Sequence, residues 1–137
     1  MKYLIFLLVF LFSANTNATN EKFFLSGKKF YNEKIYDKAK IEFEKSIVFN
    51  PKLIDSYIYL AKISLQFKNL DEEEKNLKTA LLIDPKNEEA LFLITELYIK
   101  ESDFKKAEKN YDILSSNCLK YCNKIKDLKL SIKKFNE

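Results

Sequence analysis

The residues of this sequence whose type and spacing could do chemistry are its two cysteines, Cys118 and Cys122. Outside the cytoplasm, an even number of cysteines predicts a disulfide first. Residues four apart on a regular helix have Cβ atoms about 5–6 Å apart, whereas a disulfide needs about 3.8 Å. The pair can therefore bond only if at least one cysteine lies outside regular helix, and the alternative is a pair of buried thiols.

Other kinds of chemistry find little support. The chain has no His, which removes His-based triads and the commonest general base at neutral pH. Two Cys without His cannot complete a zinc shell, and their spacing differs from the redox Cys-x-x-Cys motif. A single Gly excludes a Gly-rich phosphate loop, and the acidic run 71–74 is typical of a helix N-terminus rather than a calcium loop. We therefore predict a protein that is not an enzyme and that holds no metal or cofactor.

The N-terminal segment 1–18 has the pattern of a secretory signal peptide. Lys2 precedes an apolar run over positions 3–12, and Thr16 and Ala18 then fit the −3 and −1 positions of a cleavage site. The run is shorter than the ~20 residues of a membrane span. We expect export to the periplasm, and the alternative is an uncleaved N-terminal segment that anchors the protein at the membrane.

The elements that must position the cysteines come from a repeat. The similar tripeptides Asn50-Pro51-Lys52 and Asp84-Pro85-Lys86 define a period that divides the chain into 20–53, 54–87 and 88–119. Each segment has an apolar pattern at i, i+3, i+4 and i+7, a polar break and a second apolar run, which predicts two helices. The residue before a proline is pushed out of helix, so the second helices of the first two segments should end near Asn50 and Asp84.

Acidic residues mark the starts of the second helices. Asp37, Asp71 and Asp103 are expected to cap these helices or to lie in their first turns. Asp71 and Glu74 also have the spacing of a capping box.

The repeat resembles the tetratricopeptide family, whose signature of about 34 residues places small, aromatic and proline residues at fixed positions. The first segment matches it with Phe23, Gly27, Phe30, Ala39, Phe43, Ser46 and Pro51. The second matches with Tyr57, Ala61, Leu77, Ala80 and Pro85 but departs at Ser64 and Glu73. The third matches with Leu91, Thr95, Tyr98, Ala107 and Tyr111 and loses the pattern at Leu114 and Leu119. The resemblance implies an all-α, right-handed α-solenoid of three helical hairpins over residues 19–119.

Residues 120–137 follow the repeats and predict a C-terminal capping helix. An apolar face of Ile125, Leu128, Ile132 and Phe135 would cover the last repeat, as the end of a solenoid requires. The register places Cys118 in the loop before this helix and Cys122 in its first turn. A disulfide would then join the cap to the third hairpin and stabilise the chain by about 2 kcal/mol.

The resemblance also implies where a partner binds. In the family, three positions of each first helix face the concave side of the superhelix. Here they are Phe24, Lys28, Tyr31, Ile58, Lys62, Leu65, Phe92, Glu96 and Ile99. Most are apolar or aromatic, so we expect a groove for an apolar protein or peptide segment; the alternative is that neighbouring helices bury this stripe. Some relatives clamp a carboxylate with basic and polar residues, but this chain has Phe24, Tyr59, Glu89 and Leu93 there, so that ligand is not implied.

The charge of the chain bears on the class of partner. Its formal net charge is +4, and residues 120–137 hold six Lys against two acids. The lysine-rich cap suggests weak contact with an anionic membrane surface, which would make the protein a membrane-associated accessory subunit. Nucleic acid is disfavoured by export and by the absence of Arg. The favoured prediction is a protein–protein interaction module, an adaptor or assembly subunit of the bacterial cell envelope, whose oligomeric state the sequence does not specify.

Overall fold

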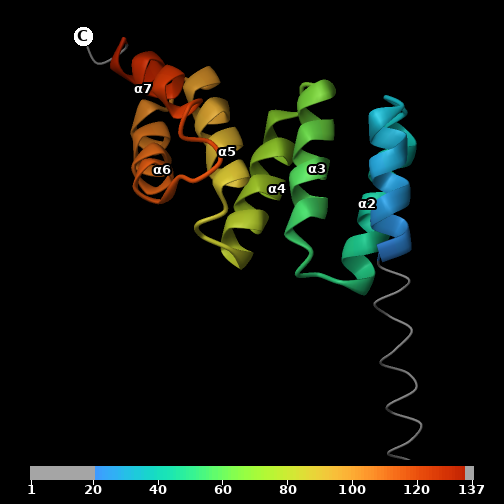
Figure 1. Cartoon of the computed structure of the whole chain (residues 1–137). Coiled ribbons are helices and arrows are strands. Elements are labelled where there is room, and N and C mark those ends of the chain that lie inside the picture. The colour runs from blue at the N-terminus through green and yellow to red at the C-terminus, as the bar shows by residue number, and fades with distance from the viewer. Residues whose placement is uncertain (1–20, 135–137) are drawn as a thin grey trace, which may run out of the picture.

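The chain is a single row of helices that ends in a short crossing helix (Figure 1). The computed structural model describes residues 21–134, so the expected signal peptide (residues 1–18) and Phe135 lie outside the described residues. The first helical segment, residues 21–32, is followed by α2 (Tyr36–Phe49), α3 (Ile54–Gln66), α4 (Leu70–Ile83), α5 (Glu88–Lys100), α6 (Phe104–Asn117) and α7 (Ile125–Lys133). Within this range there is no strand. The expected all-α fold, a solenoid of three hairpins with a capping helix, is confirmed.

The turn inside each hairpin is the same. Lys34, Lys68 and Ser102, which occupy equivalent positions of the three repeats, have positive φ values of 60°, 56° and 60°. In the first hairpin the N–H of Ile35 donates to the carbonyl of Phe30 at 2.9 Å, and the other two hairpins repeat this bond. These bonds satisfy the free carbonyls at the end of a helix without a glycine.

The turns between hairpins follow the prolines. α2 ends one residue before Asn50 and α4 one residue before Asp84, as the sequence predicts. The side chains of Asn50 and Asp84 accept backbone N–H bonds from Lys52 at 3.1 Å and Lys86 at 3.0 Å. Each turn is therefore held by the residue that ends the helix before it.

Helix starts differ in part from the sequence prediction. Asp103 caps α6 as expected, accepting from the N–H of Lys106 at 3.1 Å. Asp71 lies in the first turn of α4, but the cap is Asn69, and no capping box forms between Asp71 and Glu74. Asp37 and Asp71 thus lie in first turns, one of the two expected places, and only the capping box fails, because Asn69 is itself a good capping residue.

Small residues allow close packing between the helices. Ala39, Ala80 and Ala107, in the second helices of the three hairpins, are fully buried. Gly27 gives the closest approach, because a Cβ on it would lie 2.8 Å from the ring of Phe43. The first helix therefore rests directly on the Phe43 ring.

The capping helix is shorter than predicted. α7 begins at Ile125 rather than near residue 120, and residues 118–124 form a non-helical connector. Leu128 and Ile132 are buried, and Leu128 joins a core cluster with Leu91 and Leu114. The cap thus covers the third hairpin as expected.

Candidate partner-binding groove

Two adjoining hollows lie on the side of the stack formed by the first helices of the hairpins, which we call the helix-A face. The first measures about 200 Å³ and is lined by Phe24, Lys28, Asp55, Ile58, Tyr59, Lys62 and Glu89. The second measures about 380 Å³ and is lined by Asp55, Ile58, Asp84, Lys86, Asn87, Glu88, Glu89, Leu119, Lys120 and Tyr121. Because they share Asp55, Ile58 and Glu89, we treat them as one groove that runs from residues 21–32 across α3 to the connector.

Four of the nine predicted groove residues line the first hollow: Phe24, Lys28, Ile58 and Lys62. Ile58 is only 2% exposed, so it forms the floor and offers little surface to a partner. At this position the alternative expectation holds, since neighbouring helices bury the side chain.

The other five predicted residues line neither hollow. Tyr31 packs edge-on against Tyr59, with ring centroids 5.0 Å apart. Phe92 is covered by Tyr121 of the connector at 5.1 Å, and Ile99 packs against two of the core clusters. The remaining two are Leu65 and Glu96. The predicted stripe is therefore open at its first-hairpin end and covered at its third.

Aromatic rings build the first-hairpin end of the groove. Tyr59 stacks on the buried Phe43 with centroids 4.8 Å apart and meets Phe24 at 6.0 Å. The Lys28 Nζ lies 5.6 Å from the centre of the Phe24 ring, close enough for a cation–π contact. The rings hold one another in place, so this end presents a preformed, partly apolar wall to a ligand.

An ion pair crosses the middle of the groove. Lys62 of α3 donates a hydrogen bond to Glu89 of α5, and its Nζ also lies 5.0 Å from the centre of the Tyr59 ring. Burial alone would lower the pKa of Lys62, but its hydrogen bond and charge interaction with Glu89 outweigh that effect and raise it. Lys62 is thus held as a cation whose charge is already paired.

The equivalent pair one repeat earlier is open. Lys28 and Asp55 are the first-junction counterparts of Lys62 and Glu89, and both line the first hollow. No ion pair joins them among the described residues. The groove therefore presents one cation, Lys28, and one anion, Asp55, that do not pair with each other.

Several groove residues were not predicted as such from sequence. Asp55 lies in the first turn of α3 and could have been found by extending the repeat alignment to the helix starts. Tyr59 and Glu89 were considered only as positions of the relatives' carboxylate clamp and not as part of this groove. Tyr121 lies in the connector, where no repeat position predicts its location.

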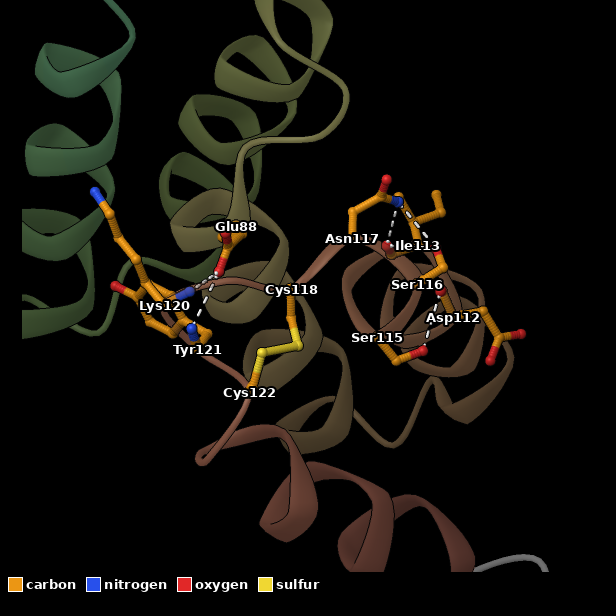
Figure 2. The surroundings of a disulfide bond; sticks show 10 residues. All are labelled: Glu88, Asp112, Ile113, Ser115, Ser116, Asn117, Cys118, Lys120, Tyr121 and Cys122. Carbon is orange, nitrogen blue, oxygen red and sulfur yellow. Dashed lines mark hydrogen bonds between the residues drawn. A yellow bond between two sulfur atoms is a disulfide. The ribbon is translucent and has the colours of Figure 1, made fainter.

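The cysteines are brought together as the sequence condition requires (Figure 2). Cys118 follows the last residue of α6 and Cys122 lies in a turn, so both are outside regular helix. They form a disulfide with Cα atoms 5.4 Å apart. The bond closes a ring within the connector rather than reaching into α7.

A buried carboxylate lies outside the groove. Glu73 of α4 occupies a position where the repeat signature has Ala; it is 2% exposed, and its Oε2 atom has no hydrogen-bond partner within residues 21–134. Burial raises the pKa of Glu73; the charge of Lys100 opposes this and those of Glu96 and Glu101 add to it. It lines neither hollow, so we give it no part in binding.

Two features are absent from residues 21–134. Between residues 21 and 134, no group of three or more Cys, Asp or Glu side chains is arranged to hold a metal ion. None of the helices in that range combines the length and apolar character that crossing a bilayer requires.

Comparison with known proteins places the fold. No family model and no curated protein matches the sequence. A domain of yeast Sti1, solved in a complex with pHsp70, aligns with a TM-score of 0.79 at 16% identity, over 85% of this chain and 98% of that one. The Arabidopsis OM64 tetratricopeptide domain gives 0.75 at 21% identity, over 89% and 98%. The Yersinia enterocolitica type III secretion chaperone SycD, solved with a peptide of the translocator YopD, gives 0.75 at 12%, over 85% and 91%. These similarities show that the chain has the tetratricopeptide repeat fold.

Proposed function

We propose that this chain, which has the tetratricopeptide repeat fold, is a non-catalytic protein–protein interaction module that binds an extended peptide in the groove of its helix-A face. Proteins of similar structure bind partners: the Sti1 domain was solved with pHsp70 and the Yersinia chaperone with a translocator peptide. We further propose that it is exported and acts in the bacterial cell envelope as an adaptor or assembly subunit. The pattern of residues 1–18 supports export.

The observation that supports the groove most is the open charge pair in an aromatic hollow. Lys28 and Asp55 flank Phe24 and Tyr59 without pairing with each other. Charged groups at the edge of an interface select complementary partners and guide association, while aromatic side chains supply contact area. The hollow therefore suits a peptide segment with an apolar or aromatic side chain flanked by charges.

Charge reversal in the groove tests this proposal. We expect Lys28→Glu and Asp55→Lys each to reduce capture of the crosslinked partner from the native host by about tenfold, equivalent to about 1.4 kcal/mol. The measurement is quantitative crosslinking and affinity capture of the exported protein, with circular dichroism to verify unchanged helix content.

Matched controls are available on the same elements. Lys29 neighbours Lys28 on the first helix but is exposed outside the groove, and Asp71 lies in a first turn as Asp55 does. Lys29→Glu and Asp71→Lys should leave capture unchanged. Equal capture by the wild type and both groove variants would remove the groove from the proposal.

A second candidate function is attachment to an anionic bilayer through α7. Lys126, Lys129, Lys133 and Lys134 are exposed without any ion pair among residues 21–134, and Leu130 between them is 63% exposed. Each lysine near an anionic surface adds about 1 kcal/mol of attraction. Sedimentation with phosphatidylglycerol vesicles should be lost when Lys129 and Lys133 are changed to Glu. Attachment through the N-terminal segment is tested separately: mass spectrometry of the mature N-terminus distinguishes a cleaved chain from an anchored one that retains Met1.

A further inference from the structure

The connector lies along the helix-A face as a bound peptide would. After α6, residues 118–124 cross the N-terminal end of α5, where Figure 2 shows Lys120 and Tyr121 beside Glu88. One carboxylate oxygen of Glu88 accepts the backbone N–H groups of Lys120 at 2.8 Å and Tyr121 at 3.1 Å. A side chain of the repeat thus holds the backbone of a non-helical segment.

The side chain of Tyr121 completes the contact. Its ring lies 5.1 Å from that of Phe92, and the Lys124 Nζ is 5.2 Å from the Tyr121 centroid and 5.9 Å from that of Phe92. Burial and the nearby carboxylate of Glu89, which also holds Lys62, raise the pKa of the Tyr121 hydroxyl. The ring and the backbone are both engaged, so this segment makes the kinds of contact that specify a peptide ligand.

The contact between Tyr121 and Phe92 lies at a repeat position whose first-hairpin equivalent lines the open hollow. Phe92 is the third-hairpin equivalent of Phe24, two repeats further along the chain. Both side chains are half-buried, but Phe24 lines a hollow, whereas the ring of Tyr121 packs on Phe92. The connector therefore occupies one end of the same surface that is open at the other.

The disulfide holds the occupying segment in a small ring. Cys118 and Cys122 enclose Tyr121, so the ring restricts the backbone conformations from which Tyr121 can leave Phe92. A dithiol reductant opens such a bond by exchange: its first thiolate attacks one sulfur, and its second displaces that sulfur as the reductant closes to its own disulfide. Two electrons and two protons pass to the protein, which is left with two thiols.

We propose that residues 119–122 are a built-in occupant of the third-hairpin end of the helix-A face, and that opening of the Cys118–Cys122 bond lets an aromatic side chain of a partner peptide replace Tyr121 on Phe92. The inference rests on the proposed function for the existence of such a partner. A tethered segment competes at an effective concentration in the millimolar range, so a free peptide reaches Phe92 with reduced apparent affinity while the ring is closed.

Fluorescence anisotropy with a defined probe tests the proposal on the exported full chain. The probe is the labelled peptide Ser-Leu-Lys-Tyr-Ser-Asn-Lys, which copies residues 118–124 with Ser for both Cys. We expect the reduced protein to bind this probe at least tenfold more tightly than the oxidised protein. Tyr121→Ala should bind it at least tenfold more tightly than the oxidised wild type, with or without reductant.

Two variants control for indirect effects. Asn123 lies in the same connector, is exposed and lines neither hollow, so Asn123→Ala should behave as the wild type in both redox states. Adding Phe92→Ser to Tyr121→Ala should abolish the gained affinity while circular dichroism remains unchanged. In hydrogen exchange, the amides of Lys120 and Tyr121 should be less protected after reduction, and those of α3 should not change.

Two results would overturn the inference: equal probe affinity in the oxidised wild type, the reduced wild type and Tyr121→Ala, or a gained affinity that survives Phe92→Ser. The first would leave the disulfide a simple staple of the connector. Neither result affects the proposed function, which depends on capture lost through Lys28 and Asp55. If capture did not depend on Lys28 and Asp55, the proposed function would fail, but the effect of reduction on probe binding could still be measured.

Discussion

The junction between the first and second hairpins and the junction between the second and third use the same two repeat positions differently. Lys62 and Glu89 pair across the second junction, whereas Lys28 and Asp55 do not pair across the first. The acid is one methylene shorter at the first junction. The junction with Glu has a formed ion pair, and the junction with Asp has an open groove.

The side chains packed around each of these two charge pairs also differ. At the first junction, Phe24 and Tyr59 rest on the buried ring of Phe43, and the hydroxyls of Ser46 and Ser56 lie 2.6 Å apart in a satisfied buried contact. At the second, Lys62 bonds to Glu89 and the neighbouring Glu88 holds the connector. Glu73 of α4 has an unpaired carboxylate oxygen within the described chain. The first junction is aromatic and open, while the second is polar and carries the connector.

The largest expected effect concerns Phe43, the buried ring on which Phe24 and Tyr59 pack at the first junction. Phe43→Ala should lower the free energy of unfolding by about 3–5 kcal/mol, because Phe43 is fully buried and its removal leaves a cavity under Tyr59. Tyr111→Ala, at the equivalent position of the third hairpin, should cost less, because Tyr111 is only partly buried. Urea denaturation of both variants measures the two values; equal costs would show that the first junction does not depend on its aromatic stack.

The next effect concerns the unsatisfied acid at the second junction. Glu73→Gln should raise the free energy of unfolding at pH 7 by about 1–2 kcal/mol, because it removes a buried charge whose oxygen lacks a partner among the described residues. The pKa of Glu73 is raised in the folded chain, so its contribution is most favourable below its ordinary value of 4.5 and is lost as the pH rises through the folded pKa.

The stability difference between Glu73→Gln and the wild type should therefore grow from about pH 4 to pH 7. Glu108 of α6, which is exposed and is not among the groups that act on Glu73, provides the control: Glu108→Gln should leave the free energy of unfolding at pH 7 unchanged. A difference that stays flat with pH would mean that Glu73 is ionised without penalty in the folded chain.

The smallest effect concerns the pair itself. Asp55→Glu should close a bridge to Lys28 and add about 0.3–0.5 kcal/mol, the usual value of a partly exposed ion pair. It should also weaken partner capture, since the two charges would then be satisfied internally. A double-mutant cycle with Lys28→Met measures the coupling. If Lys28 couples no more strongly to the new glutamate than to Asp55, the shorter side chain of Asp55 is not what keeps the pair apart.

Most of the fold could be predicted from sequence because it follows from local rules. The prolines after Asn50 and Asp84 end their helices, and the period locates the small residues that allow close packing. The capping box at Asp71 was wrong because two capping residues compete within three positions. The start of α7 was misplaced because the apolar periodicity of that segment begins only at Ile125.

The site was less predictable because it depends on contacts between segments far apart in sequence. The repeat identified Phe24, Lys28 and Lys62, since each position recurs on a known face of a first helix. It could not indicate that Phe92 is covered, because that depends on the path of the connector and on where Tyr121 lies. Periodicity predicts which positions share a face, but not what else lies against it.

The hairpin turns at Lys34, Lys68 and Ser102 have a consequence for how this protein can evolve. Each places a residue other than glycine in the left-handed region, at a cost of about 1–2 kcal/mol, and all three side chains are exposed. A change to glycine at any of them would relieve strain without altering the groove, the connector or the cores. The chain therefore has three independent sites of latent stability, which can compensate for destabilising changes wherever the binding surface acquires new specificity.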